Sequence, residues 1–155
     1  MQPRNHFDVP ADAIPHEPGR YEALDDQVGF QMRVAMQRHT SIFMSRMVAG
    51  LTQTQFATLA KLFEAGPCSQ NHLGRLIYLD AATIKGVVDR LGARGFVTTT
   101  ADPEDRRRLA VTLTESGRKV TEMAMRVAAE ITRTTLLPLT PDERRRFVEM
   151  LKKIA

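Results

Sequence analysis

Three consecutive arginines, Arg106, Arg107 and Arg108, follow Asp105 in a polar segment that carries charges of both signs. A guanidinium group keeps its charge and donates through a planar fork, so it suits phosphates, carboxylates and the narrow minor groove of DNA. Asp105 could hold the Arg107 guanidinium in place through a bidentate pair. A run of charge alone usually marks a solvated surface, so its interpretation depends on the surrounding elements.

A second candidate group lies on segment 80–94, where apolar residues at positions 84, 87, 88 and 91 follow the helix period. The opposite side of this helix has small residues, which would let its backbone lie close to DNA. Thr83 could contact a base or a thymine methyl group, while Lys85 and Arg90 suit phosphates or guanine. An ordinary amphipathic helix has the same pattern. The candidate DNA-contacting residues are Ser69, Gln70, Asp80, Ala81, Ala82, Thr83, Lys85, Gly86, Arg90, Asp105, Arg106, Arg107 and Arg108.

The elements that must position these groups are mostly helices. Apolar residues at steps of three and four predict helices over 24–49, 52–65, 69–77, 80–94, 114–137 and 140–155. The period changes to two over 96–100 and 109–113, which predicts two strands joined by the polar loop 101–108. The expected fold class is therefore mainly α with a small β-hairpin wing, in the order α-α-α-α-β-β-α-α.

Residue types at the predicted helix ends agree with these boundaries. Thr52 and Gln55 have the spacing of a capping box, and Asp80 is a favourable N-cap. Gly95 follows the helix over 80–94 at a position that favours glycine. Thr140 followed by Pro141 and Glu143 is a further helix start.

Two short helices joined by a tight turn and followed by a hairpin form a winged helix-turn-helix. The second short helix fits the major groove, and the hairpin tip reaches the flanking backbone or the minor groove. We place this DNA-binding region at 51–113. Residues 21–50 and 114–155 carry more apolar surface than one small winged domain can cover, which predicts a C2 homodimer. Its recognition helices should lie about 34 Å apart, which is one DNA turn, or a near multiple of that distance. The proline-containing segment 1–20 is interpreted as a flexible N-terminal arm.

The composition is compatible with this interpretation and disfavours several other classes. The 155 residues carry a net charge of +4, which suits a polyanionic partner without proving one. The single cysteine, Cys68, excludes an internal disulfide and fits a cytoplasmic location. We find no secretory signal, no apolar run long enough to span a membrane, and no metal-binding or catalytic motif. The chain is therefore expected to be no enzyme and to need no cofactor.

Residues 80–117, which read DAATIKGVVDRLGARGFVTTTADPEDRRRLAVTLTESG, resemble the recognition helix and wing of the MarR family of transcriptional regulators. The specific parts are VVDRLGARGFV at 87–97, DPEDRRR at 102–108 and VTLTESG at 111–117. By helix order the resemblance extends over 21–155. It implies a triangular dimer with intertwined first and last helices, and it makes Arg107 the minor-groove residue. Gly86 departs from the family, which commonly has a longer polar or basic residue there.

The resemblance also implies a repressor that binds a palindromic operator and is released by a small aromatic acid, N-heteroaromatic compound or acyl-CoA thioester. The implied pocket would be lined by the second half of 24–49, by 52–65 and by the long helix. His39, Phe43, Arg46 and Met47 share one face there, and a cation beside an apolar groove suits a carboxylate on a ring. The alternative is that His39 is an interface histidine and Arg46 forms a surface or intersubunit ion pair.

Two further functions stay open at this point. Cys68 could act as a peroxide-sensing thiol in a MarR-type regulator, although its position in a turn favours an inert thiol. A non-specific architectural DNA-binding protein is the other alternative, although such proteins usually carry more lysine. Activation in place of repression depends on the position of the operator.

Overall fold

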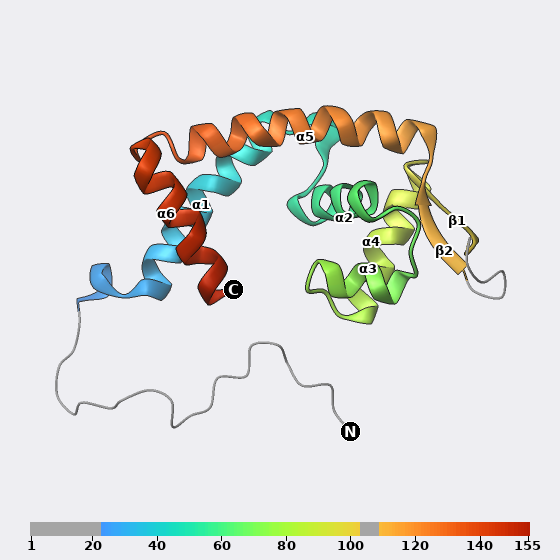
Figure 1. The fold of residues 1–155 in the computed structure, drawn as a ribbon, viewed down its shortest axis with the longest axis horizontal. Helices are drawn as coiled ribbons and strands as arrows, with labels where there is room; N and C mark the ends of the chain where they lie inside the picture. The colour runs from blue at the N-terminus through green and yellow to red at the C-terminus, as the bar shows by residue number, and fades with distance from the viewer. Residues whose placement is uncertain (1–22, 103–108) are drawn as a thin grey trace, which may run out of the picture. The chain divides into compact units, whose positions relative to one another are not determined.

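The computed structural model describes residues 23–102 and 109–155, so the arm at 1–20 lies outside the described residues (Figure 1). The chain divides into two units, residues 1–35 and 36–155. The boundary falls within the first long helix. In chain order the elements are η1 (Leu24–Asp26), α1 (Val28–Arg46), η2 (Val48–Gly50), α2 (Gln53–Ala65), α3 (Gln70–Leu76), α4 (Ala81–Ala93), β1 (Val97–Ala101), β2 (Leu109–Leu113), α5 (Glu115–Thr135) and α6 (Pro141–Ile154).

The expected order of helices and strands is confirmed, and the main difference concerns the first helix. A single helix over 24–49 is wrong, because α1 begins at Val28 and ends at Arg46. Met47 then adopts an extended conformation and is buried, while Ala49 has a left-handed backbone with φ of 55°. The chain therefore turns three residues earlier than the glycine at position 50 suggests.

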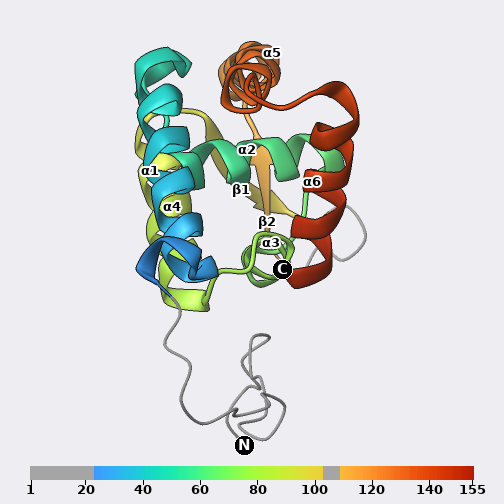
Figure 2. The same ribbon diagram turned by 90° about the vertical axis from the view of Figure 1, so that its left-hand side faces the viewer.

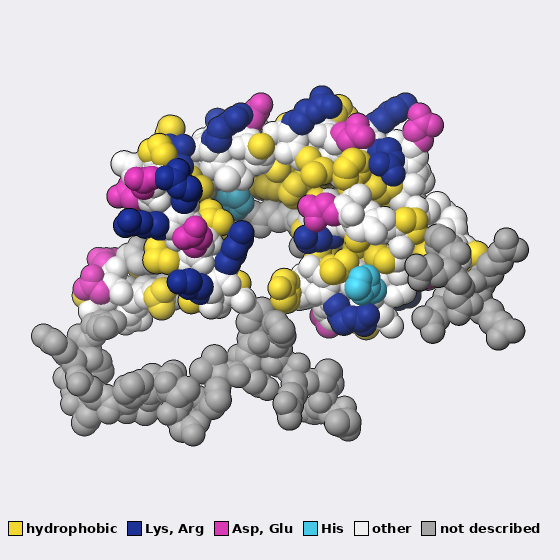
Figure 3. All heavy atoms as spheres, in the orientation of Figure 1, with side chains coloured by type: hydrophobic (Ala, Val, Ile, Leu, Met, Phe, Trp, Pro, Cys, Tyr) yellow, Lys and Arg dark blue, Asp and Glu magenta, His cyan; other side chains and the backbone are white. Residues whose placement is uncertain are grey.

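The core of the second unit joins α2, α3, α4 and the hairpin beneath α5. Leu59 of α2, Leu73 of α3 and Ile84 and Leu91 of α4 are fully buried. Figure 2 views α5 nearly along its axis, with α2 running across the picture below it. Hydrophobic side chains gather along the side of α5 that faces α2, and lysines and arginines project from the other side (Figure 3). This core supports α4 from one side only.

The hairpin is an antiparallel pair in which Val97 lies opposite Leu113 and Ala101 lies opposite Leu109. Cys68 adds an isolated bridge on the other edge of β2: its N–H donates to the Val111 carbonyl, and its own carbonyl accepts from the Val111 N–H. The base of the wing is thereby attached to the loop that precedes α3.

The joint between α4 and α5 is formed by Gly95, Phe96, Thr114 and Gly117, which contact one another closely. Gly95 ends α4 with a φ of +74°, and its carbonyl accepts a hydrogen bond of 2.6 Å from the Thr114 hydroxyl. Thr114 also caps α5 by accepting from the Gly117 N–H, at 2.9 Å. A Cβ on Gly117 would lie 1.8 Å from the Phe96 carbonyl oxygen, so this first turn of α5 contacts the backbone directly.

Candidate nucleic-acid interface

Helices α3 and α4 form the helix-turn-helix, and each begins at a capping side chain. Ser69 accepts from the His72 N–H at 3.2 Å, and Asp80 accepts from the Thr83 N–H at 2.8 Å. Buried Gly74 allows the two helices to pack closely, since a Cβ there would lie 3.1 Å from atoms of Leu79 and Ile84. The sequence therefore sets both the starts of these helices and their close contact.

The outer face of α4 carries the predicted contact residues. Ala81, Ala82 and Thr83 are exposed in the first turn of the helix, whereas Ile84 is buried. The Thr83 hydroxyl donates to the Asp80 carboxylate at 2.6 Å. Its hydrogen is committed to Asp80, so the methyl group and the two oxygen lone pairs remain available for a contact with DNA. The hydrogen bonds from Thr83 also hold the pKa of the Asp80 carboxyl below its usual value.

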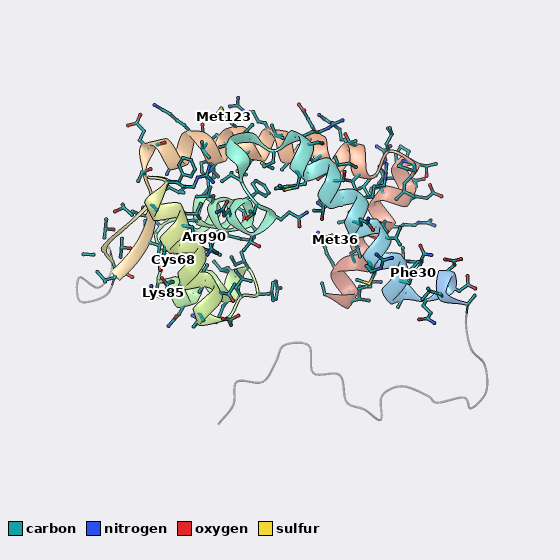
Figure 4. All side chains as sticks on the ribbon, turned by 180° about the vertical axis from the view of Figure 1, so that it is seen from behind. Phe30, Met36, Cys68, Lys85, Arg90 and Met123 are labelled. Carbon is teal, nitrogen blue, oxygen red and sulfur yellow. The ribbon has the colours of Figure 1, made fainter. Side chains whose placement is uncertain are left out.

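The two cations on this face differ in their surroundings, and both are labelled on α4 in Figure 4. Lys85 forms an ion pair of 2.6 Å with Asp89, one turn further along the helix. The Arg90 guanidinium has no ion-pair or hydrogen-bond partner among residues 23–102 and 109–155. It lies over Gly86, where a Cβ would come within 3.3 Å of its Nη1 atom.

Sequence reasoning missed two polar residues beside the first turn of α4. A shallow groove of about 230 Å³ is lined by Asn71 and Arg75 of α3 together with Leu79, Ala81 and Ile84. Arg75 is exposed there, with His72 Nδ1 3.5 Å from its guanidinium. Their helical position relative to Ser69 and Gln70, which were predicted contacts, was the available signal.

The predicted wing residues Asp105, Arg106, Arg107 and Arg108 lie outside the described residues. The strands that lead into this loop are paired up to Ala101 and Leu109. The hydrogen-bonded hairpin therefore extends to the residues on either side of this segment. The predicted pair of Asp105 with Arg107 stays a prediction.

The predicted ligand residues lie along the second half of α1 and just after it. Phe43 and Met47 are buried in the core, His39 is half-buried and Arg46 is exposed. The Phe43 ring lies between those of His39 and Phe56, with centroids 6.3 and 6.1 Å away. The four residues are thus brought to one side of α1, although two of them already pack against the protein.

Their polar ends contact the last turn of α5. His39 Nδ1 lies 2.9 Å from the Thr135 hydroxyl, and Arg46 donates to the Thr134 hydroxyl at 2.8 Å. Arg38 donates to the Thr135 carbonyl at 2.8 Å, which adds a third contact between the helices. Within this single chain Arg46 therefore donates to a neutral hydroxyl, and an ion pair between Arg46 and a second subunit stays a prediction.

Cys68 has the surroundings of a structural residue. Burial, and to a smaller extent the negative charge of Asp102, raise the pKa of its thiol above the usual value. A raised pKa lowers the fraction of thiolate, which is the form that reacts with peroxide. This environment disfavours the thiol-switch alternative.

An arrangement of two capped helices, a hairpin and an outward-facing second helix defines the winged helix-turn-helix class. The MarR family model matches residues 51–109. The transcriptional repressor NicR of Pseudomonas putida is 38% identical over 147 residues, which cover 94% of this chain and 89% of NicR. A probable transcriptional regulator from Pseudomonas aeruginosa is 47% identical with a TM-score of 0.80, over 86% of this chain and 100% of that one.

A further solved structure describes how 6-hydroxynicotinic acid regulates DNA binding by BpsR of Bordetella bronchiseptica. BpsR is 39% identical with a TM-score of 0.80, over 88% of this chain and 97% of its own. The chain therefore belongs to the MarR family, and it is a transcriptional regulator and not an enzyme. Within the described ranges, none of the helices combines the length and apolar character needed to span a membrane.

Proposed function

We propose that this protein is a homodimeric repressor that binds a palindromic operator and is released by a small aromatic acid. The observation that carries this proposal is its similarity, at nearly 40% identity and almost full length, to one protein named as a repressor and another whose DNA binding responds to 6-hydroxynicotinic acid. The operator, the dimer and the effector are each supported by particular residues of this chain.

Operator recognition is assigned to the outer face of α4 in the major groove and to Arg107 of the wing in the minor groove. The support for α4 is its one-sided burial: Ile84, Val87, Val88 and Leu91 face the core, and the small and cationic residues face outward. Small side chains in the first turn let a helix backbone approach DNA closely. The same region, 51–113, is proposed as the DNA-binding part of the chain.

Dimerisation is assigned to the segments 21–50 and 114–155. Helix α6 supports this assignment, because none of its residues is buried although it is strongly amphipathic. Its apolar residues Val148, Met150, Leu151 and Ile154 have exposed fractions between 37 and 65%. Such a face is stable in water when a second copy covers it. A two-fold dimer matches an inverted repeat, with half-sites one helical turn or a near multiple of it apart.

The effector is assigned to the contact between α1 and α5. A carboxylate would replace the neutral Thr134 hydroxyl as acceptor for Arg46, which strengthens the hydrogen bond because both partners are then charged. The aromatic ring would pack beside Phe43. Release from DNA follows only if the ligand binds the DNA-free arrangement more tightly than the DNA-bound one.

The test uses the full chain and duplexes selected from a random library by the purified protein. The selected duplexes should share one inverted repeat, bound by two chains per duplex. Adding 6-hydroxynicotinic acid should then displace the protein, as followed by fluorescence anisotropy. Arg46→Ala should retain operator binding and require at least about tenfold more ligand, because a charged hydrogen bond is lost.

Lys119→Ala is the control, since Lys119 is exposed, is ion-paired with Glu115 and lies about four helical turns before Thr134 on α5. It should leave both titrations unchanged. Selection of no common sequence would overturn the operator assignment. If the Arg46→Ala variant leaves the operator at the same ligand concentration as the wild type, the assignment of the ligand-binding residues is wrong, but the operator assignment stands.

A further inference from the structure

Helix α4 has glycine at position 86, in the middle of the face that carries its contact residues. Glycine weakens a helix interior relative to alanine, so its presence there calls for a local reason. The backbone at Gly86 is helical and only half-buried, which removes the need for a special conformation or for tight packing against the core. The reason must lie in what occupies the space outside this residue.

That space is occupied by the guanidinium of Arg90. Residues four apart lie on the same face of a helix, and long side chains extend back toward its N-terminus. A Cβ on Gly86 would lie 3.3 Å from Nη1, 3.7 Å from Nη2 and 3.8 Å from Cζ of Arg90. The planar end of Arg90 therefore covers Gly86, one turn closer to the N-terminal end of α4 than its own Cα atom.

The charges on α4 add a second argument. Asp89 pairs with Lys85 at 2.6 Å, and both side chains are more than half exposed. No such neutralising partner for Arg90 is found in the described part of the chain, and Arg90 is exposed. Lys85 is therefore paired, whereas the Arg90 guanidinium has no partner among the described residues. A guanidinium group can donate to the O6 and N7 atoms of guanine at the same time.

We propose that Arg90, lying over Gly86, is the residue of α4 that reads a guanine in each half-site. Gly86 acts as a positioning residue, because a Cβ there would force the guanidinium to shift by a few tenths of an ångström. This inference rests on the proposed operator binding and specifies which side chain gives it sequence preference.

The test measures base preference rather than affinity alone. Starting from the selected inverted repeat, each base pair is changed symmetrically in both half-sites, and the dissociation constant of every duplex is measured by anisotropy. The wild-type chain should discriminate against changes at one G·C pair by roughly 5- to 150-fold. Arg90→Ala should lose the preference at that pair and keep the others, and Arg90→Lys should do the same while retaining more affinity.

Gly86 and Lys85 provide the matched variants. Gly86→Ala should weaken the preference at the same base pair, and the double variant with Arg90→Ala should be no worse than Arg90→Ala alone. Lys85→Ala should lower affinity evenly across all duplexes, as expected of a phosphate contact.

Circular dichroism on each variant ensures that only folded protein is compared. An even loss of affinity in Arg90→Ala across every duplex would overturn the proposal, because it identifies a phosphate contact. Retention of full preference by Gly86→Ala would overturn the role of Gly86. A wild-type chain that selects no sequence at all would instead refute the operator assignment.

Discussion

The outer face of α4 and the joint between α4 and α5 belong to neighbouring parts of the chain and are built in opposite ways. On the outer face, polar groups pair with residues three or four positions away, as Thr83 does with Asp80 and Lys85 with Asp89. At the joint, Arg94 donates to the carbonyl of Ala49 and to Gln55 Oε1, and its guanidinium lies 4.7 Å from the centre of the Phe96 ring.

This difference separates the residues that hold the helix in position from those that are proposed to contact DNA. The joint connects α4 to the start of α2 and to the first turn of α5, so it determines how the helix is held. The outer face makes no contact that the core depends on. Changes at the joint should therefore reduce stability, whereas changes on the outer face should alter DNA recognition at nearly constant stability.

The largest effect that this comparison predicts is that of Gly117→Ala at the joint. A Cβ only 1.8 Å from the Phe96 carbonyl oxygen forces the start of α5 away from the strand that follows α4. We expect a loss of about 3 kcal/mol in the free energy of unfolding, measured by urea denaturation.

Gly92→Ala is the matched control, because a Cβ on this helical glycine meets the Val97 oxygen at an ordinary 3.8 Å. It should stabilise the protein by up to about 1 kcal/mol through helix propensity. Equal stabilities for the two variants would remove the distinction between the joint and the outer face.

An intermediate effect is expected for Arg94→Ala. The variant loses two hydrogen bonds from a charged donor and the contact with the Phe96 ring, but solvent partly replaces them because Arg94 is exposed. We expect a loss of about 1–2 kcal/mol in thermal or urea unfolding. Arg94→Lys should recover only part of this loss, because an ammonium group cannot reach both acceptors and stack on the ring. Full recovery by lysine would contradict the geometry described for the fork.

The smallest effect concerns the pH dependence of stability at Asp80. Because hydrogen bonds from Thr83 lower the pKa of Asp80 in the folded protein, the carboxylate stabilises the fold above its unfolded-state pKa of about 4. This contribution is lost as the pH falls through the lower folded-state value. Asn also caps helices well and does not titrate. Asp80→Asn should therefore lose less stability than the wild type on acidification, and parallel urea titrations would contradict this.

Much of the fold could be predicted because the signals that define it are local. Capping residues act on amides three positions away, and the predicted caps at Thr52, Asp80 and Thr140 are all confirmed. The change of period from 3.6 to 2 located the hairpin to within one residue at each strand end. The end of α1 was missed because burial of Met47, a tertiary effect, overrides helix propensity there.

The sequence predicted which helix faces carry the candidate sites, but not which residues contact one another there. The pattern of α4 identified its outward residues, but the distinction between Lys85 and Arg90 depends on side-chain conformations. His39 and Arg46 were placed on one face of a helix, whereas their partners Thr135 and Thr134 lie 96 and 88 residues away. No local sequence pattern encodes such distant pairs, so these partners could be identified only from the structure.

The bridge between Cys68 and Val111 consists only of main-chain hydrogen bonds, at 3.2 and 2.8 Å. These bonds use no atom of the Cys68 side chain, whereas a proline at position 68 would lack the N–H that donates to Val111. The attachment of β2 to the loop before α3 therefore needs no side-chain hydrogen bond. The bridge also occupies part of the outer edge of β2, which denies that edge to a foreign strand and protects against aggregation.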